Sequence, residues 1–452
     1  MEIDSDEDKN WQKEIAIRLK FMKLLIKNGH IVDPTVPLNQ VMDLLIEDGK
    51  IIKVEKNIQE EAEKVVHAEG KYVMPGFIDL HVHLREPGFE YKETIQTGAL
   101  AAARGGFTTI CPMPNTKPAT DSPERISSII EKAKKEAVVH VLPVGAITIG
   151  QEGKVLTDIE GMKKAGAVAI SEDGKSVMNA ALYQEAMKLA SENDLVVMAH
   201  CEDKNLAGSG AMNAGKRAEE LEIAGISNAV EDVIVARDIL LSKETNTRLH
   251  LCHCSTKDSV RMIKEAKEEG LLVTGEVCPH HFTLTEDDIK EDDANFKMNP
   301  PLRTKKDVEA LKEGLKEGIM DVISTDHAPH SEEEKKKSIK DAPFGIVGLE
   351  TAAALTITEL VRKGYLDFLG MAQKMSTNPA KVLGIDKGSL RVGKDADITI
   401  LDPEECYIIE VKDFASKGKN SPFQGREVYG KIKMTIVDGE IVYQDGIKVD
   451  KR

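Results

Sequence analysis

The hydrophobic pattern between residues 77 and 330 alternates between two kinds of segment. Short apolar runs rich in β-branched residues are followed by a polar loop, a longer stretch with helical spacing, and another apolar run. The predicted strand cores are 77–84, 107–113, 138–147, 167–171, 195–200, 248–254, 272–278 and 321–326. Predicted helices between them include 93–104, 123–137, 180–193, 229–243 and 258–270. Eight such units predict an α/β fold, a TIM-like (β/α)8 barrel, with working residues at the carboxyl ends of the strands.

Both flanks of this region show the alternation of apolar and polar residues that is typical of half-buried strands. In the first flank, Asn28-Gly29 and Asp48-Gly49 predict hairpin turns. The same alternation returns near the other end of the chain, so we predict a small β-sandwich formed by both termini. The predicted domains are an N-terminal extension (1–21), the first part of the β-sandwich (22–75), the barrel (76–388) and the second part of the β-sandwich (389–452).

The first predicted barrel strand carries a row of polar residues. Residues 77–88 read FIDLHVHLREPG, and alternation along a strand places Asp79, His81, His83 and Arg85 on one face, with apolar residues on the other. A half-solvated edge strand would give the same pattern. A Pro-Gly turn on each side instead delimits a short buried strand with a loop at its carboxyl end.

Polar residues also end four other predicted strands. They are Glu172 and Asp173 directly after the fourth strand, His200 at the end of the fifth, His253 near the end of the sixth and Asp326 at the end of the eighth. A single strand histidine is more often structural, but the shared position at one rim favours a site. Imidazoles and carboxylates together are the donor set of Zn²⁺ or a similar divalent ion. Glu172 and Asp173 compete for one role, and the sequence does not exclude Lys175 from it.

The other histidines and the nearby cysteines receive structural interpretations. Cys252 and Cys254 point away from His253 by alternation and are interpreted as small buried apolar residues. No chemistry is predicted for His280 and His281, which are left out of the site. The histidines interpreted as structural are His30, His67, His140 and His250.

Charge and composition narrow the range of partners. The net charge of −16 opposes binding to nucleic acid or to an anionic membrane. It also opposes an anionic substrate, which would need a local cationic site. No apolar run is long enough to span a membrane, and the start of the chain lacks the apolar segment of a secretory signal. Six cysteines without a CxxC pair favour a reduced, cytoplasmic compartment.

Eight motifs, in order along the chain, resemble those of a known family. They are DLHVHLREPG (79–88), CPMPNTKP (111–118), ISEDGK (170–175), MAHCED (198–203), CHCS (252–255), CPHH (278–281), MNPPLR (298–303) and STDHAPH (324–330). Over roughly residues 22–445 the chain resembles the class I dihydroorotases of the amidohydrolase superfamily. The resemblance implies zinc-dependent, reversible interconversion of N-carbamoyl-L-aspartate and L-dihydroorotate in de novo pyrimidine (UMP) biosynthesis. It implies one or two zinc ions, with two favoured.

The resemblance also implies roles for single residues. His81, His83 and Asp326 match ligands of the more buried metal, Asp173 matches a carboxylate that bridges two metals, and His200 and His253 match ligands of the second metal. Arg85, Asn115 and His330 match residues that hold the substrate carboxylate, Asn299 matches a substrate contact, and the segment 344–348, with Phe344 and Gly345, matches the backbone that meets the pyrimidine ring. Asp326 is also the candidate proton shuttle. Many superfamily relatives bridge their metals with a carbamylated lysine, where this chain has aspartate.

Two rival functions are considered. A hydantoinase or allantoinase would keep the metal ligands without the group Arg85, Asn115 and His330, and would typically carry lysine at the bridging position. A non-enzymatic scaffold that binds another pyrimidine-pathway enzyme, such as aspartate transcarbamoylase, should have lost ligands, whereas all six positions here hold competent residues. The resemblance further implies a homodimer.

Overall fold

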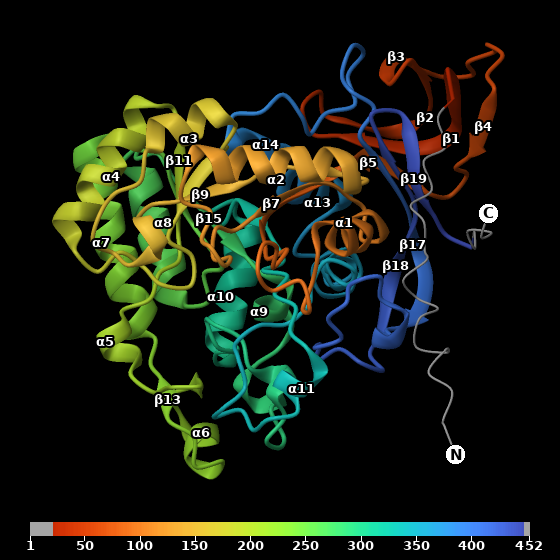
Figure 1. The fold of residues 1–452 in the computed structure, drawn as a ribbon. Coiled ribbons are helices and arrows are strands. Elements are labelled where there is room, and N and C mark those ends of the chain that lie inside the picture. Colours follow the sequence, from red (N-terminus) through yellow and green to blue (C-terminus); the bar gives the residue numbers. More distant parts are fainter. Residues whose placement is uncertain (1–20, 447–452) are drawn as a thin grey trace, which may run out of the picture.

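Both ends of the chain contribute strands to one sheet in the computed structural model, which describes residues 21–446 (Figure 1). The predicted extension 1–21 lies outside these residues, apart from its last position. The sheet order is β19-β18-β17-β5-β1-β2-β3, with β4 also paired to β1. The strands are β1 (Lys23–Asp33), β2 (Leu38–Glu47), β3 (Lys50–Glu55), β4 (Lys64–His67), β5 (Tyr72–Pro75), β17 (Ile398–Ile408), β18 (Glu427–Val437) and β19 (Glu440–Gln444).

One of the two predicted hairpin turns is correct. Asp48 and Gly49 form the turn between β2 and β3, with φ of 47° and 79°. The turn predicted at Asn28-Gly29 is wrong, because β1 continues through it. The pairing register with β2 shifts between Ile26 and Gly29, so this dipeptide forms a β-bulge inside the strand. Asn28 takes the positive φ of 58° that a bulge or a turn can equally use.

The central part of the chain forms the predicted (β/α)8 barrel of parallel strands. Strands β6, β7 and β8 pair in one group, β9, β10, β11, β14, β15 and β16 pair in a second, and the bridge between Val82 and His327 joins the first barrel strand to the end of the eighth. The strands are β6 (Phe77–Val82), β7 (Phe107–Pro112), β8 (His140–Val141), β9 (Val144–Ala146), β10 (Ala169–Ser171), β11 (Val196–Ala199), β14 (Leu249–Leu251), β15 (Val273–Val277) and β16 (Val322–Ile323).

The third predicted strand, 138–147, is two short strands rather than one. β8 pairs with β7 and β9 pairs with β10, and Leu142-Pro143 separates them. Proline has no backbone N–H for the ladder, so a continuous strand is interrupted there. The other predicted strands each contain the observed strand, which is shorter. In all of them except β10, which loses residues only at its start, the last predicted residues belong to the loops at the carboxyl rim.

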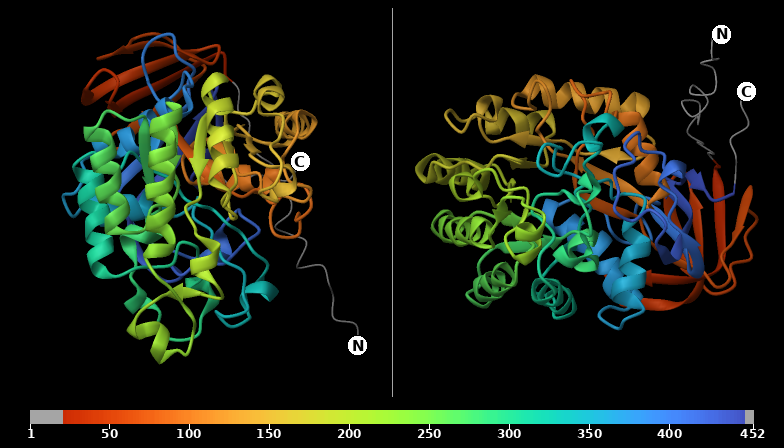
Figure 2. Two further views of the ribbon diagram at one scale, coloured as in Figure 1. Left: turned by 90° about the vertical axis from the view of Figure 1, so that its left-hand side faces the viewer. Right: turned by 90° about the horizontal axis from the view of Figure 1, so that it is seen from below.

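Helices surround the barrel strands, as Figure 2 shows in the view from below. The predicted helices form as α1 (Ile95–Arg104), α2 (Pro123–Glu136), α4 (Ala180–Glu192), α7 (Ala229–Thr245) and α8 (Lys257–Glu268). The structure also contains helices that were not predicted: α3 (Ile159–Ala165), α5 (Lys204–Ala207), α6 (Lys216–Glu220), α9 (Pro279–Thr283), α10 (Lys305–Lys316), α11 (Glu332–Lys335), α12 (Ala352–Thr356), α13 (Phe368–Ala372) and α14 (Asn378–Leu383). Two small strands, β12 (Met212–Asn213) and β13 (Gly225–Ile226), pair with each other.

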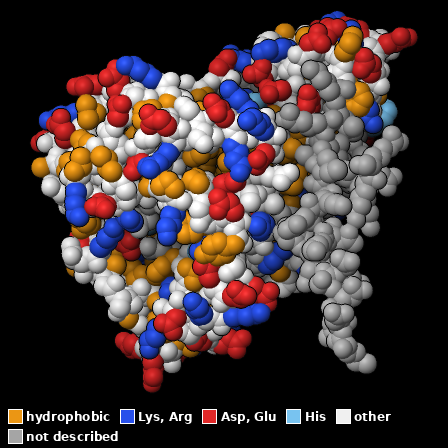
Figure 3. Space-filling view, in the orientation of Figure 1, with side chains coloured by type: hydrophobic (Ala, Val, Ile, Leu, Met, Phe, Trp, Pro, Cys, Tyr) orange, Lys and Arg blue, Asp and Glu red, His pale blue; other side chains and the backbone are white. Residues whose placement is uncertain are grey.

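The surface carries acidic and basic side chains interspersed over the face drawn in Figure 3. Within residues 21–446, no helix combines the length and the apolar character needed to cross a bilayer. Among the described residues, buried apolar side chains form four clusters, and the largest fully buried side chains include Phe77, Phe107 and Phe282 in or beside the barrel.

His140 links the barrel to the sheet of the two termini. Its Nε2 lies 3.3 Å from Asp397, just before β17, and 3.5 Å from Asp438, in the turn between β18 and β19. Burial opposes the charged imidazole, but the two carboxylates outweigh this and raise the pKa of His140 to about 9. The resulting stabilisation is fully present below the unfolded pKa of about 6.5 and is lost as the pH rises through 9.

We therefore expect the free energy of unfolding to fall by about 1–2 kcal/mol between pH 6.5 and pH 9 through this group, a value reduced because the side chain is one quarter exposed. His140→Gln should remove this part of the pH dependence, and the exposed His67→Gln should keep it. Urea unfolding at both pH values measures the difference. Identical pH profiles for wild type and His140→Gln would contradict this prediction.

Candidate active site

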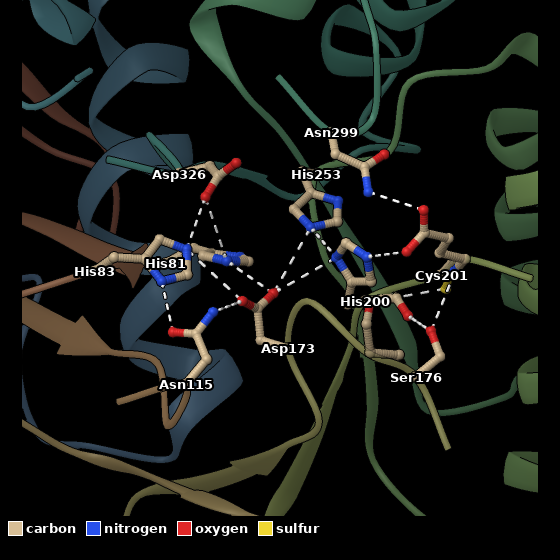
Figure 4. A network of polar contacts seen from close by, with 12 residues as sticks. His81, His83, Asn115, Asp173, Ser176, His200, Cys201, His253, Asn299 and Asp326 are labelled. Atoms are coloured by element: carbon tan, nitrogen blue, oxygen red, sulfur yellow. Dashed lines mark hydrogen bonds and ion pairs between the residues drawn. The ribbon is translucent and has the colours of Figure 1, made fainter. Parts of the chain in front are cut away.

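The six predicted metal ligands meet at the carboxyl rim of the barrel (Figure 4). They come from five barrel strands that are far apart in the sequence. His81 is on β6 and His83 follows it, Asp173 follows β10, His200 follows β11, His253 follows β14, and Asp326 follows β16. All six side chains are buried.

One half of the cluster is formed by His81, His83 and Asp326. His83 Nε2 lies 3.0 Å from Asp326 Oδ1, and His81 Nε2 lies 3.6 Å from the same oxygen. Asp173 approaches both imidazoles, with Oδ1 3.2 Å from His81 Nε2 and Oδ2 3.6 Å from His83 Nε2. Donor atoms of four residues therefore surround one small volume.

The other half is formed by His200 and His253. His200 Nδ1 lies 2.9 Å from His253 Nε2 and 3.6 Å from Asp173 Oδ1. Asp173 Oδ1 is also 3.9 Å from His253 Nε2. Asp173 thus lies between the two halves, as Figure 4 shows, in the position that a bridging carboxylate requires.

The other candidates for the bridging role point elsewhere. Glu172 accepts a hydrogen bond of 3.0 Å from the Thr148 N–H and another from the Thr148 hydroxyl. Lys175 donates to the Gln151 carbonyl at 3.1 Å. Of the three residues that the sequence left open, the structure places Asp173 among the imidazoles.

The electrostatics of the cluster suit a cation. Burial opposes ionisation of Asp173 and Asp326, yet the neighbouring histidines outweigh it and hold the pKa of both carboxyls below its ordinary value. His81 Nε2 is buried and makes no hydrogen bond of good geometry among the described residues, although Asp173 Oδ1 lies 3.2 Å from it. A buried polar nitrogen that lacks a good hydrogen bond costs free energy unless something binds it. Four imidazoles and two carboxylates that face one another in this way fit a zinc-type ion.

The loops beyond the strands hold the backbone of Arg85, His253 and Asp326 in a strained conformation. Strand β6 ends at Val82, so the predicted strand to residue 84 is too long and Arg85 reaches the site from a loop. Arg85, His253 and Asp326 have φ of 60°, 32° and 48°. Such left-handed conformations cost non-glycine residues of order 1–3 kcal/mol and persist only where the surroundings fix them.

A cavity of about 180 Å³ opens onto this cluster. Eleven of the twelve predicted site residues line it, and the twelfth, His81, is fully buried. The lining residues are His83, Arg85, Asn115, Asp173, Gly174, His200, His253, Asn299, Asp326, Ala328, His330, Phe344 and Gly345. A larger, open groove of about 860 Å³ near α1 contains none of the predicted residues.

Arg85 brings a cation to this cavity. Its Nε donates to the Pro329 carbonyl at 3.1 Å, and one terminal nitrogen lies 3.3 Å from His330 Nε2. Among the described residues, no carboxylate oxygen lies within 4.0 Å of this guanidinium. Arg85 does not pair with the acidic residues that lie close to it in the sequence, because Glu86 pairs with Lys132 and Glu90 accepts from the Gly88 N–H.

Asn115 contacts the metal-ligand cluster directly, and Asn299 reaches it through Glu202. Asn115 lies 2.8 Å from His83 Nδ1 through its oxygen and donates to Asp173 Oδ2 at 3.0 Å. Asn299 donates to Glu202 at 3.0 Å, and Glu202 in turn lies 3.3 Å from His200 Nε2. Both amides therefore line the cavity and orient the imidazoles around it.

Comparison with known proteins gives a consistent result. A family model described as "Dihydro-orotase-like" matches residues 70–259, and one described as "Amidohydrolase family" matches residues 297–443. The chain is 48% identical to a dihydroorotase of Acetivibrio thermocellus over 94% of its own length and 100% of that protein. It is 51% identical to a dihydroorotase of Pelotomaculum thermopropionicum over the same shares of the two chains. The chain belongs to the dihydroorotase family.

Solved structures related to this family member are also cyclic-amide hydrolases. An L-hydantoinase from Arthrobacter aurescens superposes with a TM-score of 0.86 at 29% identity, over 94% of this chain and 97% of that one. A dihydropyrimidinase from Brevibacillus agri gives a TM-score of 0.82 at 26% identity, over 95% and 96%. The fold is therefore shared with proteins of other names at 26–29% sequence identity.

Glu276 on β15 is an important residue of this dihydroorotase-family site that the sequence analysis missed. Its Oε1 lies 3.1 Å from His81 Nδ1 and accepts from the His253 N–H at 3.1 Å, and its Oε2 lies 3.1 Å from His250 Nε2. Burial opposes its charge, but His250 and His81 outweigh this and hold the pKa of Glu276 well below its ordinary value. The sequence feature that could have revealed Glu276 is its position as the single acidic residue inside the apolar run 272–278.

We expect Glu276→Gln to weaken metal binding about 10–100-fold, because a carboxylate that accepts from the second nitrogen of a ligand histidine fixes its ring and raises its basicity. Chelator competition measures the affinity. The exposed Glu268→Gln on α8 is the matched control and should bind metal as the wild type does. Unchanged affinity in Glu276→Gln would remove Glu276 from this role.

The two histidines that the sequence analysis left out of the site are buried beside it and do not face the cavity. His280 and His281, in α9, are buried, and burial lowers the pKa of His280 to about 4. His281 Nε2 lies 2.8 Å from the Pro300 carbonyl. Neither residue lines the cavity.

Proposed function

We propose that this protein is a zinc-dependent dihydroorotase that interconverts L-dihydroorotate and N-carbamoyl-L-aspartate in pyrimidine biosynthesis. The observation that carries the proposal is the partly buried guanidinium of Arg85, which has no carboxylate partner within residues 21–446 and lies at a cavity lined by metal-type ligands. A cation in this position suits an acidic substrate, which the net charge of −16 would otherwise repel.

The substrate carboxylate is proposed to bind Arg85, Asn115 and His330. His330 is neutral, because burial and the positive charges of Arg85 and Lys92 lower its pKa. Its Nε2–H donates to the Phe344 carbonyl at 2.8 Å, and Lys92 donates to its Nδ1 at 3.2 Å. Lys92, which the sequence analysis did not single out, thereby fixes the tautomer. Asn299 and the backbone of Phe344 and Gly345 are proposed to contact the ring.

The metal ligands are proposed as His81, His83, Asp173 and Asp326 for one zinc ion and Asp173, His200 and His253 for a second. A bound zinc ion supplies a water of lowered pKa and polarises the carbonyl that is attacked. The number and the identity of the ions are part of this proposal, which is supported by the bridging position of Asp173.

Asp326 is proposed to move the proton. In hydrolysis the oxygen of water forms a bond to the ring carbonyl carbon, and the ring C–N bond breaks. The Asp326 carboxylate takes the proton of the attacking water and donates it to the departing nitrogen, so that it starts and ends ionised. Its lowered pKa keeps it in the basic form at neutral pH.

A hydantoinase or allantoinase is the alternative within the same architecture, given the structural neighbours. Identities of 48–51% to proteins named dihydroorotase, against 26–29% to the hydantoinase and dihydropyrimidinase, favour dihydroorotate. Ultraviolet assays with dihydroorotate, hydantoin and allantoin test the assignment. We expect turnover of dihydroorotate and little of the others. Activity on the latter two alone would contradict it.

Further predictions concern location and partners. A cytoplasmic location is supported by six free cysteines, five of them buried. We expect no binding to nucleic acid or membranes, which the acidic net charge opposes. A homodimer and an association with aspartate transcarbamoylase stay predictions from the family resemblance. The boundaries 22–75, 76–388 and 389–452 are proposed as those of the two halves of the β-sandwich and the barrel between them, which agrees with the sheet that joins both termini.

A further inference from the structure

Lys335 is a buried cation that the proposed reaction does not use. It is the last residue of α11, which lies beside the loops at the carboxyl rim of the barrel (Figure 1). Its exposed fraction is 8%, and among the described residues no carboxylate lies within 4.0 Å of its ammonium group. The ammonium donates to three backbone carbonyls, those of Gly345 at 2.9 Å, Pro343 at 3.1 Å and Lys297 at 3.3 Å.

These three carbonyls belong to the loops that carry the proposed substrate contacts. Pro343 and Gly345 flank Phe344, and Lys297 lies two residues before Asn299. The helix that ends in Lys335 begins directly after His330 and Ser331. One ammonium group therefore ties together the three chain segments that line one side of the cavity.

Other contacts between these segments are weaker or uncharged. The Gly345 N–H donates to the Lys297 carbonyl at 3.0 Å, and the neutral His330 donates to the Phe344 carbonyl at 2.8 Å. Lys297 Nζ lies 4.4 Å above the Phe344 ring. Hydrogen bonds from a charged donor are roughly twice as strong as neutral ones, and an ammonium has three N–H groups to match three acceptors.

A buried cation without a counterion is costly, so the three carbonyls must replace its hydration. The charged groups that act on it are Lys297, Asp293 and Glu334, and its own charge contributes to lowering the pKa of the neighbouring His330. Burial, with a contribution from the charge of Lys297, lowers the pKa of Lys335 to about 7. A neutral side chain of the same length would avoid this cost. It could not, however, donate hydrogen bonds to all three carbonyls at once.

We propose that Lys335 is a positioning residue for the substrate: its ammonium group holds the Phe344–Gly345 backbone and the Asn299 loop at the spacing at which they meet the substrate ring. The inference rests on the proposed dihydroorotase function for the choice of substrate. It predicts an effect on substrate binding rather than on the metals or the proton transfer, because Lys335 touches none of the metal ligands.

Lys335→Met keeps the length of the side chain and removes its charge. We expect the KM for dihydroorotate to rise about tenfold or more, with kcat within about threefold of wild type and with unchanged zinc content. Lys335→Gln, which keeps two donors, should give a smaller rise. The matched control is Lys336→Met, because Lys336 is the next residue, is exposed and pairs only with Glu332 at 2.6 Å among the described residues. Its KM should stay within twofold of wild type.

The outcomes separate the two proposals. If wild type and Lys336→Met do not turn over dihydroorotate, the proposed function fails. If they do, and folded Lys335→Met or Lys335→Gln has a wild-type KM, the positioning role fails. It also fails if kcat and zinc content fall while KM is unchanged, or if neither variant folds, because Lys335 would then serve the fold as a whole.

Discussion

Asp326→Asn is expected to lower kcat for dihydroorotate by a hundredfold or more while the protein stays folded and binds metal. The amide keeps an oxygen that can face His83 Nε2, now 3.0 Å from Asp326 Oδ1, but it cannot accept and return a proton at neutral pH. Steady-state kinetics with zinc analysis of the same sample measures both parts of this prediction.

The exposed Asp386→Asn serves as the control for Asp326→Asn, because Asp386 pairs with Lys394 on the surface. It should have wild-type kinetics. Near-normal turnover in a zinc-loaded Asp326→Asn protein would remove Asp326 from proton transfer. Loss of zinc together with activity would instead limit its role to metal binding.

Arg85→Met is expected to lower kcat/KM for dihydroorotate about a hundredfold, mainly through KM. A guanidinium that meets a substrate carboxylate with little competing solvent contributes a strong charge-assisted interaction, and methionine replaces only its apolar stem. Because Arg85 makes no hydrogen bond to a metal ligand among the described residues, zinc content should not change.

Arg261→Met on the exposed face of α8 is the matched control and should leave KM unchanged. A neutral cyclic amide such as hydantoin tests the same point from the substrate side, since any slow turnover of it should be insensitive to Arg85→Met. An unchanged KM for dihydroorotate in Arg85→Met would show that its carboxylate binds elsewhere.

The barrel could be predicted because its signal is local and repeated. Each β-branched run and each helical stretch falls in the predicted order, and parallel strands that are covered on both faces must be apolar throughout. The positions of His200, His253 and Asp326 follow from the same rule, because residues after parallel strands share one rim. This is why ligands that are far apart in sequence could be placed together.

Some features of the fold and of the site could not be predicted, because they depend on three-dimensional geometry that the pattern of residues along the chain does not contain. Asn28-Gly29 suits both a hairpin and a bulge, and pairing with β2 decides between them. Arg85 reaches the cavity through a left-handed backbone rather than through strand alternation. Glu276 acts through His81, and Lys335 acts through three carbonyls, so neither carries a local motif that reveals its contacts.

This cavity is expected to be active only when its six ligands hold a divalent ion, and a zinc titration of the metal-free protein tests that dependence. Dihydroorotate hydrolysis should be nearly absent after chelation and should rise with added zinc to a plateau at about two ions per chain. Full hydrolysis by protein that retains less than about one tenth of an ion per chain would contradict the account.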